Sequence, residues 1–233
     1  MHVSLGERGQ NRSITYLSDN GADWEGPFGI GDNGYRLWRT RRGVGCSIAY
    51  YCAEWDNKED ALRLYTTRDG KIHRMLVDHP FSANNRANEF DMVFTPDDTA
   101  YCLLRQDKQG EGKMSPTQIG TARPPCTKWT WKEIPHTLRG PAITLVPDGR
   151  LLAIVGRYEK ERPSPQWTPQ HTELGWVDPE ARRYAPALKL PSGGDSSYAG
   201  PVWHGGVLWM SYYSSHGGKA SIYLAKVRTN VSE

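Results

Sequence analysis

Apolar residues recur along the chain in pairs of short runs, and a polar turn divides each pair. Such runs with turn residues between them are typical of β-hairpins, and no long stretch of helical periodicity competes with them. The turns carry Arg-Gly, Asp-Asp, Asp-Gly and Gly-Gly, which suit the positive φ angles of tight hairpins. The pattern therefore predicts four hairpins, at residues 34–51, 89–106, 140–158 and 198–215.

The predicted turns are regularly spaced. From Gly43 to Asp98, Gly149 and Gly206 the intervals are 55, 51 and 57 residues. A second series of polar turns, often closed by an aromatic residue, lies between the hairpins at residues 17–24, 66–73, 121–131 and 177–184. A repeat of about fifty residues with roughly four strands has the size of a propeller blade. We therefore expect an all-β chain folded as a β-propeller of four to five blades, with a β-sandwich as the alternative.

Composition narrows the classes of protein. We expect the 233 residues to form a single, partial propeller domain spanning 1–233. The net charge of +3 is too small to indicate a nucleic-acid partner. No segment has the length of a membrane span or a signal peptide, so we expect no membrane contact and, by default, a cytoplasmic location. The four cysteines form no CxxC pair and no metal-ligand spacing with histidine, so neither a metal nor a cofactor is expected.

The open ends of the hairpins predict where a site forms. In an antiparallel hairpin the start of the first strand and the end of the second lie together, opposite the turn. In a propeller, all of these ends face the same side. We therefore expect one mouth to collect Glu89, Arg105, Arg157 and Tyr198, with tyrosines from the ends of other strands.

These residue types suggest a chemistry. Guanidinium groups such as those of Arg105 and Arg157 bind carboxylates in a bidentate way, which predicts an anionic ligand. A free tyrosine has a pKa of about 10, so Tyr198 needs a base such as Glu89 to become a nucleophile. Arg157 is one residue out of register with Arg105, and a bulge next to Gly156 would correct its aim.

Particular stretches carry a resemblance to a known family. "LSDNGADW" fits the pattern S-x-D-x-G-x-x-W at Asp19, Gly21 and Trp24, with Leu17 in the place of the serine. Residues 190–226 look like the last blade of bacterial sialidase-like proteins, and residues 88–107 and 140–158 look like two blades before it. Over nearly its whole length the sequence thus resembles the sialidase superfamily, whose exo-α-sialidase-like members are six-bladed Asp-box propellers.

The resemblance implies roles for individual residues. Tyr198 falls at the family's nucleophile, Glu89 at its partner, and Arg105 and Arg157 at the second and third members of an arginine triad. It implies a retaining glycoside hydrolase, without cofactor and monomeric, that acts on a sialic-acid-type terminal sugar. The first triad arginine and the acid/base aspartate have no counterpart, which implies that one to two N-terminal blades are missing. Arg39 could assist as a guanidinium, and Asp56 could replace the acid.

Two other interpretations remain open, so whether the chain is an enzyme is not decided. In one, a non-catalytic sialidase-like propeller binds acidic glycans, with Tyr212, Tyr213 and His216 forming an aromatic rim. In the other, Tyr198 and Glu89 are structural and the propeller packs partners on its rim. The separation between the Glu89 carboxylate and the Tyr198 hydroxyl discriminates between these interpretations.

Overall fold

A computed structural model describes residues 2–5, 12–33, 35–42, 47–53, 62–81, 87–106, 115–158 and 170–228. These residues form strands and no helix, so none of them makes a helix able to cross a membrane. The strands are β1 (His2–Leu5), β2 (Arg12–Leu17), β3 (Glu25–Ile30), β4 (Tyr35–Arg42), β5 (Ser47–Ala53), β6 (Leu62–Thr66), β7 (Arg74–Asp78), β8 (Ala87–Phe94), β9 (Ala100–Gln106), β10 (Thr117–Ala122), β11 (Thr130–Ile134), β12 (Arg139–Leu145), β13 (Leu151–Tyr158), β14 (Gln170–Asp178), β15 (Arg183–Lys189), β16 (Ser197–His204), β17 (Val207–Ser214) and β18 (Ser221–Arg228).

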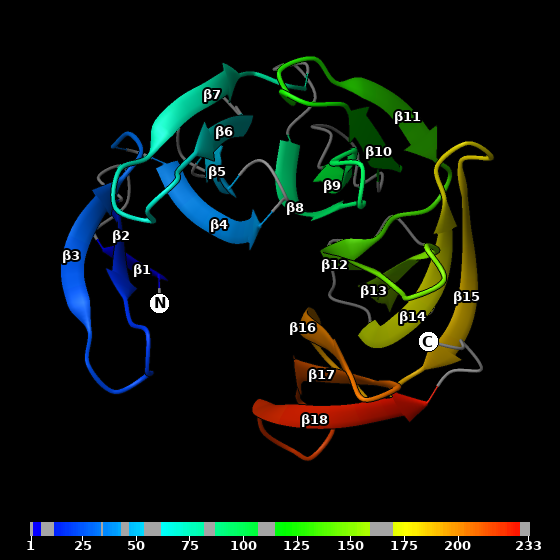
Figure 1. Cartoon of the computed structure of the whole chain (residues 1–233). Helices are drawn as coiled ribbons and strands as arrows, with labels where there is room; N and C mark the ends of the chain where they lie inside the picture. The colour runs from blue at the N-terminus through cyan, green and yellow to red at the C-terminus, as the bar shows by residue number, and fades with distance from the viewer. Residues whose placement is uncertain are drawn as a thin grey trace.

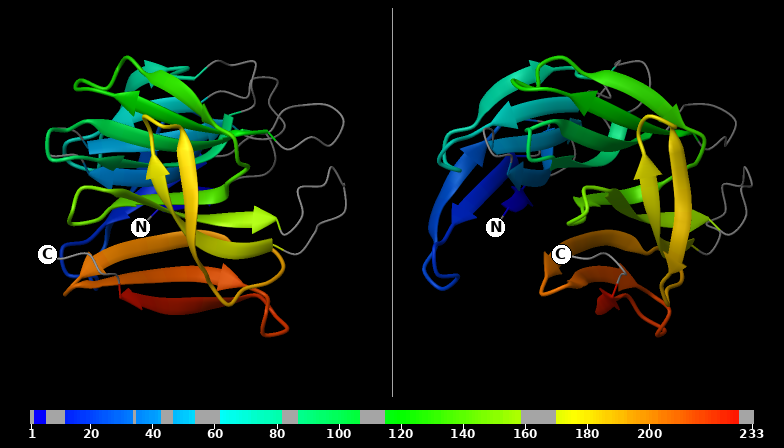
Figure 2. Two further views of the ribbon diagram at one scale, coloured as in Figure 1. Left: turned by 90° about the vertical axis from the view of Figure 1, so that its right-hand side faces the viewer. Right: turned by 45° about the vertical axis from the view of Figure 1, so that its right-hand side comes forward.

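The described strands form five antiparallel sheets, arranged around a common centre in chain order (Figures 1 and 2). Sheet A is β1–β3, sheet B is β4–β7, sheet C is β8–β11, sheet D is β12–β15 and sheet E is β16–β18. Strands β4, β8, β12 and β16 lie nearest the centre in Figure 1. The predicted propeller of four to five blades is therefore confirmed.

The four predicted hairpins are confirmed as β4–β5, β8–β9, β12–β13 and β16–β17. Three of their turns contain the positive φ angles that the turn residues suggested, at Asp98, at Gly149 and at Gly205–Gly206. The turn of the first hairpin lies outside the described residues. The local turn chemistry thus fixes the hairpins correctly.

Apolar side chains between neighbouring sheets hold the propeller together. Leu62 and Leu64 of sheet B pack against Phe90 and Met92 of sheet C in one buried cluster. A second cluster joins sheets C and D, and a third joins sheets D and E. Because strand residues alternate between the two faces, sheets C and D each bury apolar side chains on both faces. This packing fixes the positions of the innermost strands, on which the candidate site lies.

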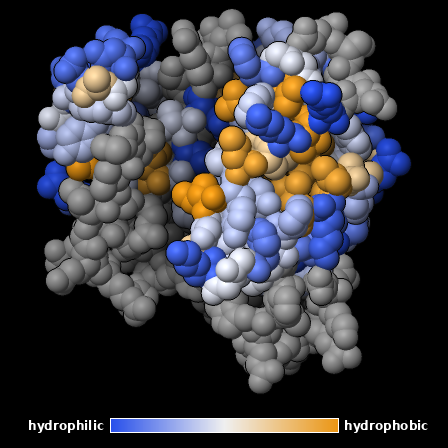
Figure 3. Space-filling view, turned by 90° about the horizontal axis from the view of Figure 1, so that it is seen from below, coloured by the Kyte–Doolittle hydropathy of each residue, from blue (hydrophilic) through white to orange (hydrophobic). Residues whose placement is uncertain are grey.

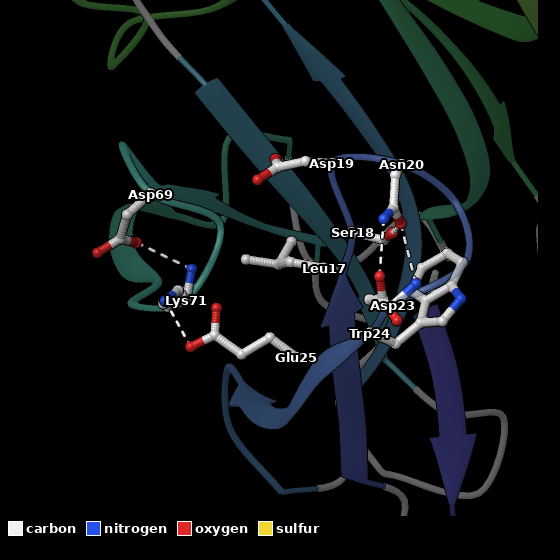
Figure 4. A pocket seen from close by; sticks show the side chains of 9 residues that line it. All are labelled: Leu17, Ser18, Asp19, Asn20, Asp23, Trp24, Glu25, Asp69 and Lys71. Carbon is white, nitrogen blue, oxygen red and sulfur yellow. Dashed lines mark hydrogen bonds and ion pairs between the residues drawn. The ribbon is translucent and has the colours of Figure 1, made fainter.

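The polar turn of sheet A is built around Asn20. Its side-chain oxygen accepts hydrogen bonds from the backbone N–H groups of Ala22 and Asp23, at 2.9 Å each, while Ser18 accepts one from Gly21. In sheet B the carboxylate of Asp69 caps its turn in the same way. The oxygen that caps this turn therefore belongs to Asn20 and not to Asp19, on which the Asp-box alignment was placed. A depression of about 550 Å³ separates the two turns, with Trp24 exposed at one side (Figure 4).

Sheet E presents an apolar face to solvent. Val202, Ile222 and Leu224 are 60%, 81% and 64% exposed. Viewed from the β18 side, apolar side chains gather on the surface among polar ones (Figure 3). The opposite face of sheet E packs against sheet D.

Candidate functional site

Each of the four innermost strands carries a β-bulge close to its start. At each bulge the inner strand advances three residues while its partner advances two, which inserts one extra residue. Such bulges bend a strand and change the direction in which a side chain points. The bulges lie between Leu37 and Thr40, Ala87 and Phe90, Arg139 and Ala142, and Ser197 and Gly200.

The bulges bring together Glu89 of β8 and Tyr198 of β16. The carboxylate of Glu89, only 6% exposed, accepts a hydrogen bond from the hydroxyl of Tyr198. It also accepts from the backbone N–H of Gly140 at 2.9 Å and forms a 2.8 Å ion pair with Arg105. Ser197 and Tyr198 themselves have positive φ angles, which is uncommon for residues other than glycine. Sequence reasoning thus correctly placed Tyr198, Glu89 and Arg105 in one group, although their roles stay predictions.

The phenol of Tyr198 is held in its protonated form. Burial, together with the charge and the hydrogen bond of Glu89, raises its pKa above the ordinary value. Its ring makes an edge contact with Trp38 and stacks on Tyr213, with ring centroids 5.6 Å apart in both cases. Near neutral pH, Tyr198 is therefore a hydrogen-bond donor set between two aromatic rings.

Tyr213 extends this group outward. Burial and the nearby carboxylate of Asp195 raise its pKa. We call the set Trp38, Arg39, Glu89, Arg105, Tyr198 and Tyr213 the axial cluster. With the N–H of Gly140, the axial cluster draws on sheets B, C, D and E.

Arg39 occupies the bulge of β4, next to Trp38. Its guanidinium donates to the carbonyl oxygen of Ala199 at 3.1 Å and lies 3.8 Å from the carboxylate of Asp91. Burial lowers the pKa of Arg39, partly offset by Asp91. The prediction that Arg39 reaches the site is geometrically correct, because the bulge turns a mid-strand residue toward the centre.

Asp91 is a buried carboxylate that sequence reasoning missed. It is 0% exposed and accepts two hydrogen bonds from Arg41, at 2.8 and 2.5 Å. It also accepts one from the backbone N–H of Ile143 at 3.0 Å. Asp91 thereby joins sheets B, C and D, next to Arg39 of the axial cluster. A charged residue in the apolar run of β8 was the signal that could have identified it.

Arg157 lies in a different group from the one predicted. Its guanidinium donates to the carbonyl of Thr137 at 3.2 Å and lies 3.7 Å from Glu173. Glu173 in turn accepts a 3.0 Å hydrogen bond from the hydroxyl of Tyr184, and His171 is 3.3 Å away. We call Arg157, His171, Glu173 and Tyr184 the sheet cluster, because all four lie on β13–β15. The expected bulge is on β12, opposite Gly156, so Arg157 keeps the regular alternation of β13 and faces sheet C.

The three residues of the predicted aromatic rim also lie in different places. Only Tyr213 joins the axial cluster. Tyr212 is buried and donates to the carbonyl of Pro191 at 2.9 Å. His216 is exposed beyond the end of β17, where its ring lies 4.3 Å from that of Tyr223. The placement of His216 in the binding site is therefore not supported by its contacts, and Asp56 lies outside the described residues.

The charges of the predicted arginines are compensated within the protein. Arg105 pairs with Glu89, Arg39 lies beside Asp91 and a backbone carbonyl, and Arg157 lies beside Glu173. A guanidinium already bound to a carboxylate gains less from a carboxylate ligand. The described residues also contain no group of His, Cys, Asp and Glu placed to hold a metal ion. The axial cluster thus combines aromatic faces with a phenol–carboxylate pair and holds its charges in internal pairs.

Comparison with known proteins identifies the class of fold. No family model matches the sequence, and no curated protein matches it. Among solved structures, a protein of unknown function from Dyadobacter fermentans has a TM-score of 0.71 at 17% identity, over 94% of this chain and 64% of that one. A xylan β-1,4-xylosidase from Bacillus halodurans has 0.62 at 13%, over 84% and 40%. A family GH43_1 enzyme from Xanthomonas citri, in complex with xylotriose, has 0.56 at 12%, over 84% and 70%.

These similarities establish the fold, a β-propeller. The enzymes named among the similar structures are xylosidase-type and family-43 glycoside hydrolase propellers, so the resemblance to sialidases was wrong. The sialidase function, the acidic ligand and the Asp-box assignment are wrong with it, and so is the expectation of six blades that rested on them. The chain spans less than two thirds of the length of the first two structures.

Proposed function

We propose that this chain binds a neutral, xylan-type glycan at its axial cluster, as part of a glycoside hydrolase. The observation that carries the proposal is the Tyr198–Glu89–Arg105 group, held where the bulged innermost strands meet. Similarity to propellers named as xylosidases and family-43 hydrolases supports the class of substrate.

The residue types of the axial cluster suit a neutral sugar. The rings of Trp38, Tyr198 and Tyr213 offer faces and edges on which the C–H surface of a sugar can pack. Hydroxyl groups of the sugar can use the remaining hydrogen-bonding capacity of the phenols. The internally paired guanidiniums favour a ligand without its own carboxylate. Aromatic walls with a few placed polar groups are typical of small-molecule sites.

Calorimetric titration with xylotriose tests the proposal, using the wild-type chain and Tyr198→Phe. The variant keeps the ring but removes the hydroxyl that donates to Glu89. We expect the wild type to bind and Tyr198→Phe to bind about tenfold more weakly, which corresponds to roughly 1.4 kcal/mol. Hydrolysis of xylotriose, followed by chromatography of the products, measures the enzymatic part in the same samples.

The chain offers a matched control in Tyr184→Phe. Tyr184 also donates its hydroxyl to a carboxylate, that of Glu173, but it belongs to the sheet cluster. This variant should bind xylotriose like the wild type. The proposal is wrong if the wild type shows no binding at millimolar xylotriose, or if the two Phe variants lose affinity equally.

A further inference from the structure

Ser197 is a buried serine that directly precedes Tyr198 at the start of β16. It is 1% exposed, and its hydroxyl donates a 2.9 Å hydrogen bond to the carbonyl oxygen of Gly140 on β12. The two residues are 57 positions apart in sequence and belong to sheets E and D. This hydrogen bond therefore ties the start of β16 to the start of the neighbouring innermost strand.

The hydrogen bond of Ser197 completes a closed ring of contacts. The N–H of Gly140 donates to the carboxylate of Glu89 at 2.9 Å, and the same carboxylate accepts from the hydroxyl of Tyr198. Three members of the ring, Glu89, Gly140 and Tyr198, lie inside the bulges of three different innermost strands. A displacement of Ser197 is therefore passed on to the meeting point of Tyr198 and Glu89.

The backbone of this ring adopts conformations that are costly for residues other than glycine. Ser197 has a φ of +134° and Tyr198 a φ of +49°. Such conformations persist only where the surrounding structure holds them, and they are common at functional sites. The two bulges also pack closely, because a Cβ at Gly140 would lie 3.1 Å from the hydroxyl oxygen of Ser197. The strain thus lies at the residues that set the direction of the Tyr198 side chain.

We propose that Ser197 is a positioning residue of the axial cluster, whose hydroxyl, bound to Gly140, holds the strained start of β16 so that the phenol of Tyr198 stays on Glu89. The inference rests on the proposed function and deepens it. Its physical reason is preorganisation: a side chain that is already fixed in the free protein does not have to be ordered when the sugar binds.

Calorimetric titration with xylotriose compares the wild type with Ser197→Ala and Ser197→Gly. Both variants remove the hydroxyl, so we expect each to bind about fivefold more weakly, because the ligand must then order Tyr198 itself. Glycine accepts a positive φ and alanine does not, so Ser197→Gly should resist urea better than Ser197→Ala. The more stable of the two variants should therefore bind no better than the other, which separates positioning from stability.

A double-mutant cycle with Tyr198→Phe tests whether Ser197 acts through Tyr198. In the Tyr198→Phe background the phenol is already absent, so Ser197→Ala should add no further loss of xylotriose affinity. A purely structural role would lower affinity equally in both backgrounds. Ser192→Ala is the matched control, because Ser192 also donates its hydroxyl to a backbone carbonyl, that of Leu190 at 2.8 Å. It lies between β15 and β16, and its substitution should leave affinity unchanged.

The outcomes separate the two proposals. A wild type that does not bind millimolar xylotriose overturns the proposed function and this inference with it. A wild type that binds, with Ser197→Ala or Ser197→Gly binding equally well, overturns the role of Ser197 alone, and so does an equal loss in both backgrounds of the cycle. A loss that disappears in the Tyr198→Phe background supports the role. If Ser197→Ala fails to fold by circular dichroism, Ser197→Gly takes its place in the cycle.

Discussion

The axial cluster and the sheet cluster contain the same chemical groups in different settings. Each has a phenol that donates to a carboxylate, with a guanidinium beside it: Tyr198, Glu89 and Arg105 in one, Tyr184, Glu173 and Arg157 in the other. The sheet cluster lies on three neighbouring strands of one sheet. The axial cluster joins residues from three sheets, B, C and E, with Tyr198 and Glu89 separated by 109 positions in sequence.

The difference between the clusters lies in the backbone that presents them. The Tyr184 ring lies against Gly175 of β14, where the absence of a side chain leaves room for it. Tyr198 and Glu89 instead lie in β-bulges that turn their side chains toward the other innermost strands. We therefore expect the same residue types to be structural within one sheet and available for a ligand where bulged innermost strands converge.

The largest expected effect is a difference in protein stability between substitutions of the two carboxylates, Glu89 and Glu173. Glu89→Gln leaves the buried Arg105 without its counter-charge, so the free energy of unfolding should fall by about 3–5 kcal/mol. Glu173→Gln should cost only about 1 kcal/mol, because Arg157 lies 3.7 Å away and keeps its bond to Thr137. Urea denaturation measures both values. Equal losses would show that the clusters are held in the same way.

A substitution at Gly175 perturbs the sheet cluster alone. A Cβ at this position would overlap the ring of Tyr184, which must move away from Glu173. We expect Gly175→Ala to destabilise the protein by about 1–3 kcal/mol through overpacking, with xylotriose affinity unchanged. Gly29→Ala is the control, because a Cβ there meets nothing within 4 Å. Reduced xylotriose affinity in Gly175→Ala would mean that the two clusters are coupled.

The smallest expected effect concerns the dependence of stability on pH, and it should be the same for both clusters. Burial and a neighbouring carboxylate raise the pKa of both Tyr198 and Tyr184. A raised pKa in the folded state means that the stabilisation is present below the unfolded value of about 10 and is lost as the pH rises above it. Stability should therefore fall between pH 10 and 11, and Tyr198→Phe and Tyr184→Phe should each flatten the fall. Urea denaturation across pH 8–11 checks this; a slope that neither variant alters would contradict it.

Local sequence signals were sufficient for the hairpins. The turns at Asp98 and Gly149 require positive φ angles, which only a few residue types adopt easily. The turns could therefore be located from the residue types without tertiary information. The open ends of the hairpins then predicted that Glu89, Arg105 and Tyr198 lie together. This prediction was correct because the start of an inner strand stays beside the end of its partner even where a bulge shifts the register.

The rest of the site depended on features that the sequence does not display. Arg157 was misplaced because the bulge formed on β12 and left β13 regular. His216 was misplaced because the chain leaves the sheet just after β17. The acidic ligand was wrongly predicted because the carboxylates that compensate Arg39 and Arg105 become their neighbours only in the folded protein.

A crystal structure of the chain soaked with xylotriose tests the central claim most directly. The account predicts sugar density against the rings of Tyr198 and Tyr213. Density at the sheet cluster, or in the depression beside Trp24 with the axial cluster empty, would contradict it.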